Sequence, residues 1–433
     1  MLWSRLYLAA VPIIVHTTNA SPTPDEDGKI SNVPLPVEKV ATSHLLMAEN
    51  VLPLRRIGSA AKSSAVLQNA SDASPNTTSI LPVHKGLGYA IKISFGGKEF
   101  EVILDTGSSD LWLPKRGVKC SGDDGTSTAC NFGPLAGPGF QDGGITNETF
   151  KIKFLDETNT AGVLGYEDVG IGGITVRRQK VALVDQAHFD GFKVTSGLIG
   201  FGYPSITNAY TLGGARVPYN NWLFNAIDQK LIGPVFSLAI ERGTDGGQLA
   251  LGGLPTVPFD HTFASTPILK ADPSSASHEA SNYSDYSEYS IVPDGFDLNG
   301  QWRAYPNLSS LVVDSGATAM HLPSSEAVRI NDAFHPPAKY DGKHEVYHVR
   351  CNAKPPSLAM KIGGALFPIK AEDMIIPRST TLHSESLLPK GRCMSGVQDS
   401  IKEQNILGDT FLKNVVAVFD IGHGQMHFAP HDY

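Results

Sequence analysis

The sequence has few charged residues and no block of basic ones. Charged side chains make up 18% of the 433 residues, and the formal net charge at pH 7 is −8. A nucleic-acid-binding surface needs clustered positive charge, so we expect no nucleic-acid partner. Glycine and proline are plentiful, at 43 and 29 residues, between short segments of Val, Ile, Thr and Phe. This composition predicts an all-β protein, and the length predicts two or three domains.

Long apolar runs are lacking after the N-terminus. The first twenty residues contain Arg5, an apolar run to Val15, and the small residues Thr18 and Ala20 before a possible cut. This pattern predicts a secretory signal peptide over 1–20, with a buried N-terminal helix as the alternative. Because no second run or hydrophobic tail follows, we expect a soluble monomer with neither a transmembrane helix nor a lipid anchor.

Sequons for N-glycosylation fit this secretory route. We expect the mature chain outside the cell, or in a vacuole as the alternative. The five candidate acceptors outside the signal peptide are Asn69, Asn76, Asn147, Asn282 and Asn307.

Cysteine is rare, and no C-x-x-C pair occurs among the four cysteines. In an oxidising compartment an even count suggests two disulfides, for which three connectivities exist. The two pairs lie far apart along the chain. Local pairing is therefore favoured, Cys120 with Cys130 and Cys351 with Cys393.

Metal-ligand patterns are also scarce. The spacing of His423, His427 and His431 would align the rings on a helix, but "VFDIGHGQMHFAP" is typical of a strand, a glycine turn and a second strand. Such a hairpin should scatter the three rings, so we expect no metal site and no cofactor.

A polar leader precedes the β-patterned part of the chain. Residues 21–56 are rich in proline and end in the basic pair Arg55-Arg56, and residues 57–87 are a Ser/Ala/Asn-rich stretch. We predict a propeptide over 21–56 that is cut after Arg56, with a disordered leader as the alternative. Regular strands begin near Gly88, where "GYAIKISFGGKEFEVIL" predicts two strands joined by a Gly-Gly turn.

Two short stretches of the sequence follow the same pattern. In "EVILDTGSSDLWLP" an apolar strand leads to Asp105, and in "SSLVVDSGATAMHLP" another leads to Asp314. One such motif alone predicts only an Asp-initiated turn. However, Gly200 of "SGLIGFGYP" lies 95 residues after Asp105, and Gly408 of "QNILGDTF" lies 94 residues after Asp314. We interpret the chain as an internal duplication that places the two aspartates opposite each other.

Paired carboxylates provide acid and base together. Two carboxylates about 3 Å apart cannot both ionise and share one proton. One can act as a general base on water while the other donates a proton to a substrate carbonyl, which is the chemistry of peptide hydrolysis. A serine hydrolase is not favoured, because the sequence has no G-x-S-x-G motif.

The sequence resembles pepsin-type aspartic proteases, and the fungal secreted members more than the animal ones. The similarity runs from about Gly88 to Pro430 and includes "VILDTGSSDLWLP", "AGVLGYEDVGIGG", "SGLIGFGYPSI", "VVDSGAT" and "NILGDTFLKNVVAVFD". It implies two related β-lobes, at 88–255 and 256–433, with a deep cleft between them. A β-hairpin flap would cover protein or peptide substrates bound in this cleft.

The resemblance also assigns roles to individual residues. Asp105 and Asp314 match the catalytic pair, and the four cysteines match one disulfide in each lobe. The residues that would support the pair are Thr106, Gly107, Ser108, Trp112, Ser315, Gly316 and Thr318. The residues that would contact substrate are Phe154, Leu155, Asp156 and Leu198. We expect acidic pH dependence, a preference for bulky apolar residues beside the cut, and tolerance of lysine through Asp156.

Several positions depart from the family pattern. Phe154 replaces the flap tyrosine, Leu155 and Glu157 replace flap glycines, and Ala317 replaces a hydroxyl residue that bonds the second aspartate. The alternative function is therefore a weakly active or inactive pepsin-fold protein that binds or inhibits. A Ser/Tyr/acid-rich insertion at 271–290 predicts an exposed loop, most simply a solvated spacer.

Overall fold

The computed structural model describes most of the chain from His44 onward. The predicted signal peptide, Arg55-Arg56 and four of the five sequons lie outside the described residues, whereas Asn147 is described and exposed. Among the described helices, none is long and apolar enough to cross a membrane. The described residues are 44–48, 50–54, 80–83, 88–122, 125–189, 193–242, 246–271, 283, 285–305, 309–377 and 388–431.

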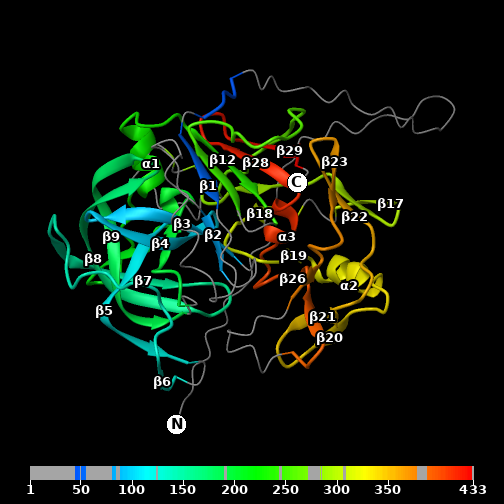
Figure 1. Ribbon diagram of the computed structural model, residues 1–433, viewed down its shortest axis with the longest axis horizontal. Coiled ribbons are helices and arrows are strands. Elements are labelled where there is room, and N and C mark those ends of the chain that lie inside the picture. Colours follow the sequence, from blue (N-terminus) through cyan, green and yellow to red (C-terminus); the bar gives the residue numbers. More distant parts are fainter. Residues whose placement is uncertain are drawn as a thin grey trace, which may run out of the picture. The chain divides into compact units, whose positions relative to one another are not determined.

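A ten-stranded sheet is built from the first half of the chain (Figure 1). The predicted Gly-Gly hairpin is confirmed, since Gly96 and Gly97 join two of its strands with φ of 55° and 73°. Glycine is favoured there because both turn positions need a positive φ. The strands are β2 (Ile80–Val83), β3 (Gly88–Phe95), β4 (Lys98–Asp105), β5 (Leu111–Ser121), β6 (Ser127–Thr128), β7 (Gly144–Lys153), β8 (Asn159–Ile171), β9 (Ile174–His188), β10 (Leu198–Gly200) and β11 (Ala209–Thr211).

Three smaller sheets are built from the second half (Figure 1). The first contains β15 (Ser290–Ile291), β18 (Leu311–Val313), β27 (Ile406–Leu407), β19 (Met320–Leu322) and β26 (Val397–Asp399). The second contains β17 (Gln301–Ala304), β16 (Gly295–Leu298), β22 (Leu358–Ile362) and β23 (Ala365–Ile369). The third contains β20 (Lys339–Asp341), β21 (Val346–Arg350), β25 (Arg392–Ser395) and β24 (Ile375–Ile376).

A six-stranded sheet joins the two halves. Its strands, in spatial order, are β1 (Asn50–Leu54), β13 (Gly247–Leu251), β12 (Val235–Ile240), β28 (Val415–Asp420), β29 (Gln425–Pro430) and β14 (Ala264–Pro267). Every residue of β28 is buried, as expected for a strand covered on both faces. Because this sheet takes strands from both halves, the lobe boundary at 255/256 stays a prediction.

The first strand of that sheet comes from the predicted propeptide. β1 pairs antiparallel with β13, from Asn50 opposite Leu251 to Leu54 opposite Gly247. Upstream of β1, the backbone N–H of Ala48 donates to Leu254 O at 2.9 Å. The part of the leader that the structure describes is therefore an ordered edge of the sheet.

The α-helices among the described residues are few, α1 (Trp222–Asp228), α2 (Ser324–Asp332) and α3 (Asp409–Leu412), and a short 3₁₀ helix lies at Pro204–Ile206. The side chain of Asn221 caps α1 by accepting from Phe224 N at 3.1 Å. The local disulfide pairing is present, with Cα–Cα distances of 5.3 Å for Cys120–Cys130 and 4.9 Å for Cys351–Cys393. Each disulfide joins residues within one half.

The described end of the 271–290 insertion is not a solvated spacer. The ring of Tyr286 stacks on Tyr203 with centroids 5.1 Å apart, and Tyr283 packs edge-on against Phe224 at 4.5 Å. Tyr289 is fully buried. The expectation of a solvated loop was wrong for these tyrosines, because their rings cover apolar surface on the first half.

Candidate active site

Two equivalent turns carry the predicted aspartates. β4 ends at Asp105 and β18 ends just before Asp314. The two halves pair these strands in the same way: β10 pairs parallel with β4, and β27 pairs parallel with β18. β10 ends at Gly200 and β27 ends just before Gly408, so each brings a glycine beside an aspartate turn. A Cβ on Gly200 would lie 2.4 Å from Ser108 O, and one on Gly408 would lie 2.3 Å from Ala319 O, so both positions require glycine.

Reciprocal hydrogen bonds tie the two turns together. The hydroxyl of Thr106 donates to Val313 O at 2.9 Å and accepts from Ser315 N at 3.0 Å. The hydroxyl of Ser315 donates to Leu104 O at 3.0 Å and accepts from Thr106 N at 3.2 Å. All four contacts are buried, so losing either hydroxyl would leave polar groups of the other half unsatisfied. This symmetry holds the two turns in register.

The glycine of each motif lies against the carboxylate of the other. A Cβ on Gly107 would lie 2.5 Å from Asp314 Oδ2, and a Cβ on Gly316 would lie 2.5 Å from Asp105 Oδ1. The two carboxylates therefore meet between the turns. Each also accepts from its own turn: Gly107 N donates to Asp105 Oδ1 at 2.8 Å and Gly316 N to Asp314 Oδ1 at 2.7 Å.

The electrostatics of the pair are asymmetric. Burial, and then the neighbouring Asp105 carboxylate, raise the pKa of Asp314 well above its usual range, while the hydrogen bond from Gly316 opposes this shift. Asp105 is 5% exposed and accepts a further hydrogen bond of 2.5 Å from Ser108 Oγ. Asp105 thus accepts from two donors, whereas the environment of Asp314 favours its proton. The pair can therefore supply a base and an acid together.

The predicted flap is the hairpin between β7 and β8. Phe150 and Ile152 are buried while Lys151 and Lys153 are exposed, which is the alternation expected of a strand with one covered face. The turn begins at Phe154, whose N–H donates to Thr158 O at 2.8 Å. At the tip, the carboxylate of Asp156 accepts from Thr158 N at 3.0 Å and from its hydroxyl at 2.6 Å. Asp156 therefore stabilises its own turn, and it is exposed.

Behind the hairpin lies a group of aromatic rings. Phe189 lies 5.7 Å from Phe154 and 5.0 Å from Trp112, measured between ring centroids. The indole N–H of Trp112 is buried, and no described protein atom accepts from it. Phe154, which has no hydroxyl, contributes only packing here. Leu198 pairs with Trp112 and is 4% exposed, so little of its surface is available for a substrate.

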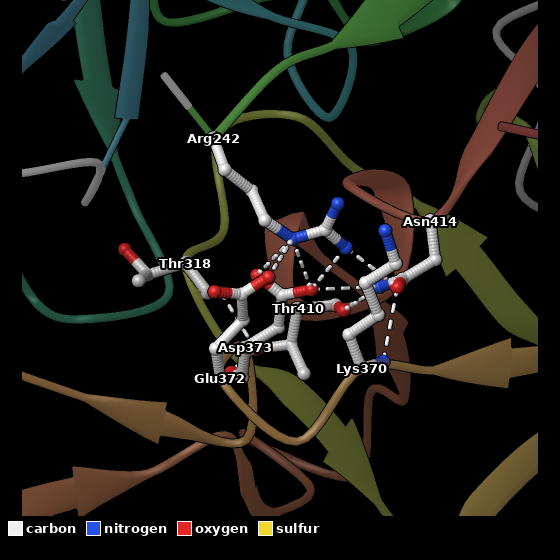
Figure 2. Close-up of polar contacts among 7 residues, drawn as sticks. All are labelled: Arg242, Thr318, Lys370, Glu372, Asp373, Thr410 and Asn414. Atoms are coloured by element: carbon white, nitrogen blue, oxygen red, sulfur yellow. Dashed lines mark hydrogen bonds and ion pairs between the residues drawn. The ribbon is translucent and has the colours of Figure 1, made fainter. Parts of the chain in front are cut away.

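A buried polar cluster supports the second turn from behind (Figure 2). Thr410 donates to Thr318 O through its N–H at 3.1 Å and its hydroxyl at 3.2 Å. Asn414 Nδ2 donates to Thr410 O at 3.0 Å and to Asp373 Oδ2 at 3.1 Å. Arg242, which follows β12, binds the Asp373 carboxylate through Nε at 2.9 Å. The loop that contains Thr318 is thus anchored to a strand of the first half.

Two features of this region were not predicted from the sequence. Asp409 follows Gly408 and is fully buried, and neither of its carboxylate oxygens has a hydrogen-bond partner among the described residues. Its place directly after the apolar-apolar-Gly element was the available signal. The second is an ion pair between Glu157 at the hairpin tip and Lys402 of the second half. No local pattern could indicate that pair, because 245 positions separate the two residues.

Comparisons with known proteins agree with this geometry. The family model described as eukaryotic aspartyl protease matches residues 88–431. A probable aspartic-type endopeptidase of Aspergillus fumigatus is 33% identical over 97% of this chain and 95% of its own. Rhizopuspepsin of Rhizopus chinensis is 26% identical over 83% and 82%. The crystal structure of the aspartic proteinase from Irpex lacteus shares the fold, with a TM-score of 0.60, 17% identity, and coverage of 80% of this chain and 95% of that one. The chain therefore belongs to the eukaryotic aspartyl protease family.

Proposed function

We propose that the protein is an aspartic endopeptidase in which Asp105 and Asp314 share one proton. The observation that carries this proposal is the reciprocal approach of Gly107 and Gly316 to the opposite carboxylates, which would lie 2.5 Å from a Cβ placed on either glycine. Only a paired arrangement of the two turns gives this geometry.

In the proposed reaction each carboxyl group accepts a proton once and donates a proton once. Asp105 accepts a proton from a water molecule as its oxygen attacks the peptide carbonyl carbon. Asp314, which burial and the adjacent carboxylate keep protonated, donates its proton to the carbonyl oxygen. The resulting gem-diol collapses when Asp105 gives its proton to the leaving nitrogen, Asp314 takes a proton from a gem-diol hydroxyl, and the C–N bond breaks, which restores both carboxyl groups to their starting forms. The apparent pKa values of activity belong to the pair.

Substrate contacts are proposed at the hairpin and the strands behind it. Phe154 and Leu155 would present apolar surface, which supports a preference for bulky apolar residues beside the cut. A carboxylate at Asp156 would favour a lysine only weakly, since the group is exposed and already accepts two hydrogen bonds from Thr158.

The test of the proposed function is cleavage of a denatured protein at acidic pH. We expect hydrolysis that a transition-state-mimicking peptide inhibitor blocks. A chain that binds this inhibitor without cutting any protein would instead be a pepsin-fold binding or inhibitor protein, which is the alternative function.

We further propose that the chain is a secreted zymogen that is cut after Arg56. The apolar N-terminal run, the basic pair and the sequons support this, as does the end of β1 at Leu54, just before the pair. N-terminal sequencing of the secreted protein should find Ile57 or a residue in the following stretch. A mature chain that starts at Ser21 would contradict the proposal.

Ala317 is expected to set the pH range of activity. Its N–H approaches Asp314 O at 3.4 Å, but its methyl group offers no donor to the carboxylate. In Ala317→Thr, a hydroxyl bonded to ionised Asp314 would lower the pKa of the pair by about 0.5–1 unit. The profile of kcat/KM against pH should move toward acid by that amount. Ala317→Val, which has the same shape without the hydroxyl, is the control and should leave the profile in place.

The ion pair between Glu157 and Lys402 is expected to restrain the hairpin tip. The hydrogen bond from Lys153, and then the one from Lys402, lower the pKa of Glu157 to about 2. The pair is exposed, so Lys402→Met should lower the KM of a large substrate by no more than about fivefold. The difference should vanish in about 1 M salt, where exposed charges are screened. Lys402→Arg should behave like the parent protein, and a salt-independent effect would contradict this interpretation.

A further inference from the structure

Three imidazole rings converge on one buried carboxylate at the end of β28. His44 Nε2 lies 2.6 Å from Asp420 Oδ2, and His427 Nε2 lies 3.3 Å from the same oxygen. His423 Nδ1 lies 3.0 Å from both oxygens of Asp420. The ligand atoms of His44, Asp420 and His427 all lie within 4.8 Å of one another. We call these four residues the histidine cluster.

The expectation that the hairpin would scatter the histidines was wrong for two of the three. β28 and β29 form the predicted hairpin, with Asp420 opposite Gln425 in the last pair. His427 therefore lies on β29 two residues beyond that pair, and His423 lies in the turn, so both reach back to Asp420. The sequence pattern did not indicate that both histidines contact Asp420. His44 comes from the leader, 376 positions away.

We propose that the histidine cluster is a site for a divalent transition metal of the Zn²⁺ class. The imidazoles of His44 and His427 and the carboxylate of Asp420 are three ligands of the types that tetrahedral Zn²⁺ takes with a water in the fourth position, whereas Ca²⁺ and Mg²⁺ prefer oxygen alone. Ligand atoms bound at about 2.0–2.2 Å in a tetrahedron lie roughly 3.3 Å apart. The separation of Asp420 Oδ2 from His427 Nε2, 3.3 Å, is already close to this value. His44 Nε2, now 2.6 Å from the same oxygen, would have to move outward, while His423 contacts the carboxylate from outside this group of three.

The residues around the cluster orient one ligand and leave a path to solvent. Ser265 Oγ lies 2.7 Å from His427 Nδ1. When a metal takes Nε2, the ring proton resides on Nδ1 and donates to Ser265, the kind of second contact that fixes a ligating histidine. His427 and Asp420 are buried, at 0% and 2% side-chain exposure, whereas His44 and His423 are 32% and 58% exposed. An ion can therefore enter from the side of the exposed rings.

A metal at this place would fasten the leader to the body of the protein. His44 lies six residues before β1, and the segment between them is bonded to Leu254 through Leu46 O and Ala48 N. If the chain is cut after Arg56, as proposed above, the described part of the leader would be held by these contacts, the β1–β13 pairing and the cluster. Metal binding would thus retain the cut leader on the sheet.

Zinc binding by the full chain tests the site itself. Protein purified with its leader attached, and stripped with a chelator, should bind one Zn²⁺ at about pH 7, where imidazole is largely neutral. His44→Gln and Asp420→Asn should each weaken binding by at least about 100-fold. His261→Gln, which changes an exposed histidine outside the cluster, should bind zinc normally. Co²⁺ should give a tetrahedral absorption spectrum that is lost in His44→Gln.

The outcomes distinguish the metal site from the proposed peptidase activity. Absence of zinc binding, or equal binding by His44→Gln and His261→Gln, would overturn the site. His44 is partly exposed and belongs to the leader, outside both the Asp105 and the Asp314 turns, so His44→Gln should fold and hydrolyse protein as the parent does, whatever the result. After cleavage at the basic pair, the leader should remain bound in zinc and dissociate in chelator. Equal retention in both would overturn the role of the metal in holding the leader.

Discussion

Replacing either Asp105 or Asp314 by asparagine is expected to lower kcat by at least about 10³-fold. Each carboxyl group is needed in both its charged and its neutral form during one turnover, and an amide can be neither acid nor base. Because the two act as one proton-sharing unit, the double replacement should cost hardly more than either single one. The measurement is the hydrolysis rate of a denatured protein at acidic pH for the three variants.

The control for these variants is Asp332→Asn, which changes an exposed carboxylate at the end of α2. It should leave the rate unchanged. Circular dichroism should show all variants folded, since an amide has nearly the same volume as a carboxyl group and can accept from the N–H of Gly107 or Gly316. A single variant with near-parent activity would place the chemistry elsewhere in the molecule.

Raising the pH from about 4 to about 7 is expected to destabilise the fold. Burial, which is the largest cause in each case, raises the pKa of Asp110, Asp314 and Asp409. A carboxyl group whose pKa is higher in the folded state contributes full stability below its unfolded pKa of about 3.9, and this contribution is lost as the pH rises through the folded value. The melting temperature should fall by about 5–10 °C over this range.

Asp409→Asn should reduce the fall in melting temperature between acidic and neutral pH. The carboxylate of Asp409 has no hydrogen-bond partner among the described residues. Burial raises its pKa, the charge of Lys413 opposes this shift, and the charge of Asp373 adds to it. At acidic pH the variant and the parent are both neutral at this position and should melt alike, while near neutral pH the variant should melt higher. Asp332→Asn is again the matched control. A melting temperature of the parent that stays level between about pH 4 and about pH 7 would contradict this expectation.

Local patterns predicted several elements of the fold. The hairpin of β3 and β4, the strand before Phe154 and the hairpin of β28 and β29 were each predicted from alternation and glycine turns, because both signals depend on adjacent residues. The repeated distance from aspartate to glycine also indicated the internal duplication. A duplication is visible in the sequence because both copies keep the same turn chemistry.

Contacts between distant segments were beyond such patterns. Nothing near Glu157 indicates Lys402, and nothing near Asp373 indicates Arg242. The tyrosines of the 271–290 insertion were interpreted as part of a polar loop, because composition does not tell which apolar surface a ring will cover. Asp409 was likewise passed over, since burial without a partner is a property of its surroundings.

The sequence by itself determined the β-class, through its composition, and it determined the two aspartate turns and their pairing, because these rest on a short motif that occurs twice. Only the tertiary structure decided how the Thr106 and Ser315 hydroxyls cross, how each motif glycine meets the opposite carboxylate, and that His44 joins His423 and His427 on Asp420. These contacts join segments 207 to 376 positions apart. The order of residues along the chain does not indicate these contacts, because the atoms come together only through the strand register of the folded sheets.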